Sequence, residues 1–258
     1  MDIRSRLRSL KWICWNPGID TMLALASVAA MNVIFYVNAK YAETHPLVFL
    51  LLFVLVGNLG VNTLGPAWYV LRIRHERAAE LGLTAVRWPL SIAISLAIAL
   101  WSWPGLLRVA SDAGLDEAAI VRQVAFNALV FWEVFFVFGW LQLRFERAFG
   151  ILPAIPLASL GFAAYHFGTF PTEGLTELFQ VGLVFAIAFR ITRSVLALIP
   201  IAWSVVSSIG TIPAGFLATW EAVYLYIVLV GIQVAGLALL MRPSRSLNPA
   251  GVSWTTRY

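Results

Sequence analysis

Residues 131–150 read FWEVFFVFGWLQLRFERAFG, a strongly apolar run in which Glu133 is the one carboxylate before the charged end at Arg144, Glu146 and Arg147. No other acid in the sequence lies as deep in an apolar segment. A lone carboxylate in hydrocarbon is costly, so it usually marks a functional site with a hidden partner. The one histidine in a comparable setting is His166, in the next apolar segment. The sequence therefore predicts a fold organised around a Glu133–His166 pair.

Composition indicates that the chain is embedded in a membrane. Of its 258 residues, 60% are hydrophobic and 12% are charged, whereas soluble domains carry about 25% charged residues. The apolar runs are long and continuous rather than alternating, which favours helices over a β-barrel. We expect an all-α integral membrane protein with about eight transmembrane helices. Their expected ranges are 21–37, 47–70, 89–107, 121–143, 156–170, 175–189, 194–212 and 219–241.

The basic residues predict how the chain is oriented. Eight spans would put both termini on one side, and fifteen of the eighteen Lys and Arg residues fall on that side. The positive-inside rule then places both termini in the cytoplasm, and we expect a bacterial cytoplasmic (inner) membrane. Residues 1–20 are expected to form a basic interfacial segment, 21–241 a single transmembrane domain and 242–258 a cytoplasmic tail. This distribution explains the net charge of +5 without a nucleic-acid partner.

Depth in the membrane supports the Glu133–His166 pair. Glu133 lies eleven residues before Arg144 and His166 lies ten residues after Pro156, which corresponds to depths of about 16 Å and about 15 Å at 1.5 Å per residue. Two antiparallel helices would bring both side chains to one level. A carboxylate beside an imidazole can polarise water as a general base. The alternative is a buried Glu–His bond that only joins two helices.

A metal or another cofactor is not expected. Catalytic zinc normally takes three protein ligands, and only Glu133 and His166 lie at depth, so a conventional zinc site is disfavoured. The single cysteine, Cys14, excludes an internal disulfide and a cysteine-rich metal site. The expected partners are the lipid bilayer and a membrane protein or peptide.

Two short motifs resemble those of a membrane-protease family. Residues 133–142, EVFFVFGWLQ, resemble the first motif of the CPBP (Abi, type II CAAX prenyl endopeptidase) family, which reads Glu-Glu, three residues, Arg, followed by Gly, an aromatic residue, Leu and Gln. Residues 162–166, FAAYH, resemble the second motif, Phe, three residues, His. The resemblance covers about residues 81–208. It implies a helical bundle in which Glu133 and His166 activate water for peptide hydrolysis.

The sequence departs from the family pattern at three places. Val134 replaces the second Glu and Phe138 replaces the Arg, so two apolar residues spaced i, i+4 share one helix face. No histidine follows His166, so the third motif, which stabilises the oxyanion in the family, lacks its His. Trp203 and Ser207 have the spacing of that motif and are candidate weak oxyanion donors. Loss of one such donor typically costs about 10²–10³ in rate.

Three functions therefore stay open at the level of sequence. The chain could be a divergent intramembrane endopeptidase that uses Glu133 and His166. It could instead keep the fold without catalysis and bind or help assemble another membrane protein or complex, as a pseudoenzyme does. It could also act on a lipid or isoprenoid-like molecule, with Glu133 as acid or base.

Overall fold

The computed structural model describes residues 11–41 and 44–242, and the regular elements within this part of the chain are helices. The all-α prediction is thereby confirmed. The first half of the predicted interfacial segment and the predicted tail beyond Arg242 lie outside the described residues.

Within the described residues, five helices are long and apolar enough to cross a membrane. A sixth span arises if α6 (Glu117–Ala128) and the helix Phe131–Phe149, which meet at a 43° bend, are counted as one. The helices Ile151–Ala164 and Leu198–Thr211 are apolar but shorter. A multispan membrane protein is confirmed, whereas the expected count of eight is not. The five long helices are α2 (Ile19–Tyr41), Phe49–Ile73, α5 (Trp88–Asp112), α10 (Thr172–Thr192) and α12 (Trp220–Met241).

Several helices are built from consecutive segments of different winding. Gly65 donates its backbone N–H to Gly60 five residues earlier, the π-helical pattern, within the helix Phe49–Ile73. The elements other than α6 and the long helices α2, α5, α10 and α12 are, in chain order, α3 (Pro46–Val48), η1 (Phe49–Leu64), α4 (Gly65–Trp68), η2 (Tyr69–Ile73), η3 (Ala78–Leu81), α7 (Phe131–Val134), η4 (Phe135–Gln142), α8 (Leu143–Phe149), α9 (Ile151–Ala164), η5 (Leu198–Trp203) and α11 (Ser204–Thr211).

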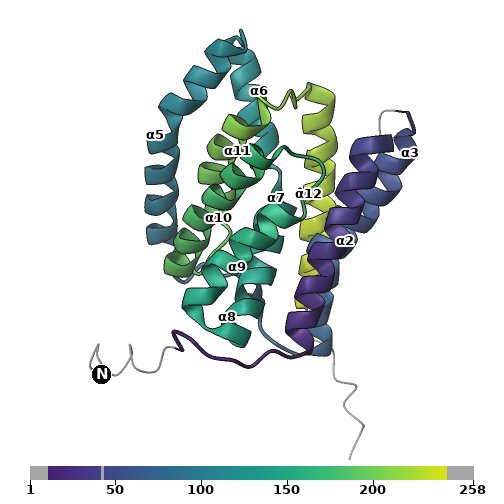
Figure 1. Cartoon of the computed structure of the whole chain (residues 1–258), viewed down its shortest axis with the longest axis vertical. Coiled ribbons are helices and arrows are strands. Elements are labelled where there is room, and N and C mark those ends of the chain that lie inside the picture. Colours follow the sequence, from purple (N-terminus) through teal and green to yellow (C-terminus); the bar gives the residue numbers. More distant parts are fainter. Residues whose placement is uncertain (1–10, 42–43, 243–258) are drawn as a thin grey trace, which may run out of the picture.

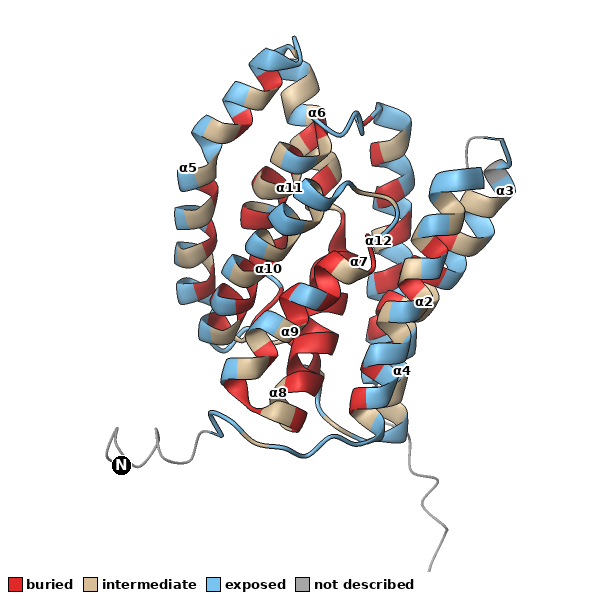
Figure 2. Ribbon diagram, viewed as in Figure 1, coloured by how far each residue is buried: buried red, intermediate tan, exposed pale blue. Residues whose placement is uncertain are grey.

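The central helix, Phe131–Phe149, consists of α7, η4 and α8 and forms the middle of the bundle (Figure 1). Every residue of α7 and η4 is buried, and Figure 2 shows buried residues concentrated along this helix. It packs against α2, α9, α10 and η1. At Gly139 the helix lies so close to η3 that a Cβ would clash with the carbonyl oxygen of Leu81. Since Phe and Val are weak helix formers, burial is what stabilises this segment.

The helix expected over 121–143 is broken, which corrects the prediction of one continuous segment. Val130 adopts φ −76° and ψ 59°, outside the helical region, and separates α6 from α7. Gln123 bonds to the Thr211 hydroxyl at 2.9 Å and Asn127 to the Ser208 hydroxyl at 3.0 Å, so polar side chains attach the end of α6 to α11. The central helix instead packs against α2 and α9. No Pro or Gly marks this break in the sequence.

The helix expected over 156–170 is also displaced toward the N-terminus. It runs over Ile151–Ala164 and starts directly after Gly150, which has φ +88°. Pro153 lies in its first turn, where a missing N–H has no cost. His166 consequently lies in the turn that follows α9 rather than within a helix.

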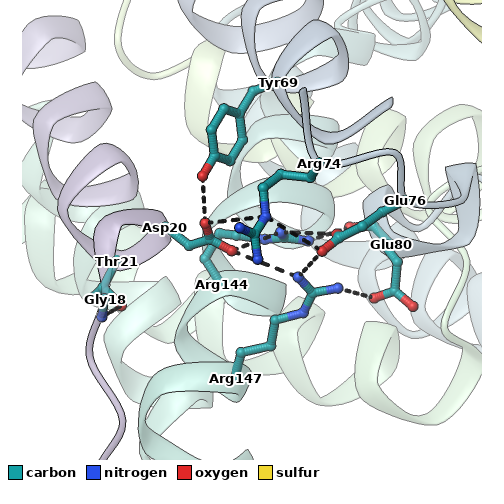
Figure 3. A network of polar contacts seen from close by, with 9 residues as sticks. All are labelled: Gly18, Asp20, Thr21, Tyr69, Arg74, Glu76, Glu80, Arg144 and Arg147. Atoms are coloured by element: carbon teal, nitrogen blue, oxygen red, sulfur yellow. Dashed lines mark hydrogen bonds and ion pairs between the residues drawn. The ribbon is translucent and has the colours of Figure 1, made fainter. Parts of the chain in front are cut away.

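Charged side chains join α2 to the Arg-rich end of the central helix (Figure 3). Arg144 is fully buried and reaches Asp20 and Glu76 at 3.4 Å each, and it donates to the Glu80 carbonyl at 2.8 Å. Arg147 binds Glu76 at 2.7 Å. Each buried charge here has an opposite charge beside it, which is what a buried ion needs to be tolerated.

Glu76 shows the electrostatic effect of this charged network. Burial disfavours its carboxylate, but the hydrogen bond and charge of Arg147, together with Arg144, outweigh burial and lower the pKa of Glu76. Glu76 is therefore charged in the folded protein at lower pH than an isolated glutamate would be.

Candidate functional site

Glu133 lies in the first turn of α7, immediately after the break in the helix. The partial positive charge at a helix N-terminus stabilises an anion at this position. The Tyr165 hydroxyl donates to Glu133 Oε1 at 2.6 Å, and His166 Nε2 lies 3.7 Å from the same oxygen. The side chains of Glu133 and His166 are 10% and 7% exposed. The two residues singled out from the sequence thus meet in a buried polar site that also contains Tyr165.

The His166 ring is fixed by one hydrogen bond and by aromatic neighbours. Nδ1 lies 2.9 Å from the Phe162 carbonyl oxygen, so Nδ1 carries the hydrogen that this contact needs. In neutral imidazole, Nε2 is then a hydrogen-bond acceptor that faces Glu133. The rings of Phe35, Phe170 and Phe162 lie 4.9, 5.1 and 5.3 Å from the His166 ring, centroid to centroid. The imidazole is therefore oriented within apolar walls.

Helix α2 positions the turn that carries His166. The Asn32 side-chain amide donates to the Phe167 carbonyl at 2.8 Å and to the Ala164 carbonyl at 3.2 Å. These are carbonyl groups at and beyond the end of α9, which lack partners within the helix. Asn32 is a positioning residue, since it acts on the site through the backbone around His166.

Trp203 and Ser207 differ in their availability as hydrogen-bond donors. Trp203 is buried, its ring lies 5.5 Å from Phe162 and 4.9 Å from Phe185, and its Nε1–H finds no acceptor among the described residues. Ser207 donates its hydroxyl to Asn127 Oδ1 at 3.2 Å. The Trp203 N–H is thus unengaged, whereas the Ser207 proton already has an acceptor.

Val134 and Phe138, which stand where the motif of the resembled family has Glu and Arg, are both fully buried. The Phe138 ring lies 6.1 Å from Phe185 and 6.4 Å from Phe189, so it packs in an aromatic group against α10. The space around Phe138 is therefore filled by apolar side chains.

Sequence reasoning missed two residues of this site, Tyr165 and Asn32. Tyr165 directly precedes His166 in the second motif, and this adjacent hydroxyl could have marked it as a site residue. Asn32 carried a weaker signal, as a lone amide in the apolar segment 21–37. Within the described residues, no group of three or more His, Cys, Asp or Glu side chains could hold a metal ion.

Comparison with known proteins finds one family model that is similar to the part of the chain that carries this site. Residues 116–204 match the family model described as Rce1-like, type II CAAX prenyl endopeptidase. No curated protein and no solved structure matches the chain significantly. The match begins at the N-cap of α6 and includes Glu133, His166 and Trp203. Residues 116–204 are therefore similar in sequence to the Rce1-like type II CAAX prenyl endopeptidases, which confirms the family resemblance that the two motifs predicted.

Proposed function

We propose that the chain is an intramembrane endopeptidase of the CAAX-protease type, in which Glu133 and His166 activate water. The observation that carries this proposal is the approach of His166 Nε2 to within 3.7 Å of Glu133 Oε1 in a buried site. This distance between the two atoms is too long for a direct hydrogen bond. With the hydrogen of His166 on Nδ1, its Nε2 is a hydrogen-bond acceptor, as is the Glu133 carboxylate. A water molecule that donates one hydrogen to each therefore satisfies both groups.

The chemistry follows from these positions. Glu133 takes a proton from the water as the water oxygen attacks the carbonyl carbon of a peptide bond, and His166 orients the water. The proton then passes from Glu133 to the amide nitrogen as the C–N bond breaks. The unengaged N–H of Trp203 is the donor proposed for the oxyanion, with Ser207 as the weaker candidate because its proton is shared with Asn127. Tyr165 holds one carboxylate oxygen of Glu133 in place.

A second candidate is binding without catalysis, and the packing of Phe138 favours it. An apolar aromatic group stands where the family has a guanidinium. Replacing a whole buried ion pair by apolar residues can leave the stability of the fold unchanged. It does not by itself preserve enzymatic activity. The chain would then bind or help assemble another membrane protein. Chemistry on a lipid or isoprenoid-like molecule is a further proposal, and it predicts a change in extracted lipids between wild type and Glu133→Gln.

The test compares peptide termini of membrane proteins in cells that express wild type, Glu133→Gln or His166→Ala. The control is Glu177→Gln, an exposed acid on α10. We expect termini that depend on the wild-type chain to fall by about 10²-fold or more in both site variants and to persist in the control. If Glu133→Gln and His166→Ala retain the cleavage, or if no terminus depends on the wild-type chain, hydrolysis is excluded. Unchanged co-purification of membrane proteins with all variants would then support the binding role.

A further inference from the structure

A basic pocket lies at the Arg-rich end of the bundle, well away from Glu133. It has a volume of about 690 Å³ and is bordered by the C-terminal ends of α8 and α10 and the start of α9. Its charged lining consists of five cations and two carboxylates: Lys11, Arg87, Arg147, Arg190 and Arg193, with Glu80 and Glu146. Positive side chains therefore exceed negative ones in this pocket.

Pairing within the pocket does not use all of the positive charge. Glu146 is shared by Arg193 at 2.6 Å and Arg190 at 3.8 Å, so one carboxylate serves two guanidinium groups. Among the described residues, Lys11 and Arg87 have no carboxylate within ion-pair distance, and Arg87 donates only to the Ile191 carbonyl at 2.6 Å. The pocket thus has cationic groups left for an anion.

An apolar cavity lies on the other side of the same chain segment. Residues 11–16 run beside the turn between α8 and α9, where Cys14 donates its backbone N–H to the Phe149 carbonyl at 2.9 Å. Lys11 and Asn16 line the basic pocket. Ile13 and Trp15 line an apolar cavity of about 510 Å³ between this segment, α2, α8 and α9. One segment therefore has a basic pocket on one side and an apolar cavity on the other.

We propose that the basic pocket binds the phosphate group of an anionic phospholipid, with the neighbouring apolar cavity receiving an acyl chain. Basic pockets at the ends of membrane helices bind anionic headgroups, and the leaflet on the cytoplasmic side, where the sequence places this end, carries a negative surface potential. A soluble phosphate would use the cations but not the apolar cavity. The pairing of the two cavities therefore favours a lipid over a free anion.

The test measures lipid binding to the full chain purified in a nonionic detergent. Native mass spectrometry follows the binding of phosphatidylglycerol and of phosphatidylcholine, and thermal unfolding is recorded with each lipid and with inorganic phosphate. The variant is the double change Lys11→Gln and Arg87→Gln. The matched control is Arg77→Gln, which removes an exposed cation outside the pocket.

We expect wild type to prefer phosphatidylglycerol, the double variant to bind it about thirtyfold more weakly, and the control to bind it as wild type does. Equal binding of the two lipids, or equal weakening in Arg77→Gln, would overturn the proposal. Equal protection by inorganic phosphate would show a site for free phosphate and overturn the lipid assignment. If the double variant does not fold, Lys11→Gln alone should lose about fivefold in affinity, and unchanged affinity would overturn the proposal. None of these readouts depends on peptide cleavage.

Discussion

The two ends of the central helix each contain a buried charge, and the two charges differ in whether oppositely charged groups surround them. At one end the Arg144 guanidinium is completely buried, but it is surrounded by Asp20, Glu76 and the Glu80 carbonyl. At the other end Glu133 accepts one short hydrogen bond from Tyr165, and no Lys or Arg among the described residues lies within ion-pair distance. A buried charge with opposite charges beside it is tolerated by the fold and is costly to break, whereas a charge left without a counter-ion is available for chemistry.

The largest expected effect is the loss of Arg144. Arg144→Ala leaves the Asp20 and Glu76 carboxylates close together without their buried partner, and breaking a buried pair costs about 3–5 kcal/mol. Because both carboxylates retain some exposure, 16% and 19%, we expect a value near the low end, about 3 kcal/mol. Denaturant titration in detergent micelles measures this loss of unfolding free energy. The control Arg77→Ala, at an exposed position, should change the free energy of unfolding by less than about 0.5 kcal/mol. A similar loss of stability in both variants would contradict the expected difference between the buried and the exposed arginine.

A smaller effect is expected at the opposite end for Tyr165→Phe. The variant removes the hydroxyl that donates to Glu133 and leaves a buried acceptor, at a cost of about 1.5–3 kcal/mol for a hydrogen bond to a charged group. The control is Tyr224→Phe, since Tyr224 is 62% exposed on α12. Equal unfolding free energies for Tyr165→Phe and wild type would show that the 2.6 Å contact contributes no stability.

The smallest effect is the pH dependence of the charged network. The folded-state pKa of Glu76 is lowered, so its contribution to stability is present above the pKa of the unfolded chain and is lost as pH falls through the folded pKa. Since Glu76 is partly exposed, we expect less than about 1 kcal/mol. Unfolding titrations between neutral and acidic pH measure the slope. Glu76→Gln should flatten this part of the curve, and an unchanged slope would assign the pH dependence to other groups.

Much of the fold followed from the sequence, because long apolar runs determine where helices form. The segment expected over 219–241 matches α12, with Thr219 as its N-cap accepting from Ala222 N at 3.2 Å. The break at Val130 did not follow, because it arises from side-chain contacts between α6 and α11 rather than from a local breaker. Hydrophobic periodicity contains no information about such contacts.

The site was predicted in part, for a similar reason. Depth along the two apolar segments predicted that Glu133 and His166 lie at one level, and the two side chains do meet, although His166 lies in the turn after α9 rather than within a helix. The displaced end of α9 and the Asn32 contact depend on how α2 packs, which lies outside the family match at 116–204. That Tyr165 is the donor to Glu133 depends on the turn conformation around His166, which the second motif does not specify.

The proposal that Glu133 serves chemistry rather than folding is tested most directly by measuring two properties of Glu133→Gln in one preparation. The amide keeps an acceptor for Tyr165 but cannot take a proton from water. We expect an unfolding free energy within about 1 kcal/mol of wild type and a loss of wild-type-dependent peptide cleavage of about 10²-fold or more. Retained cleavage, or a loss of stability as large as that of Arg144→Ala, would contradict this role.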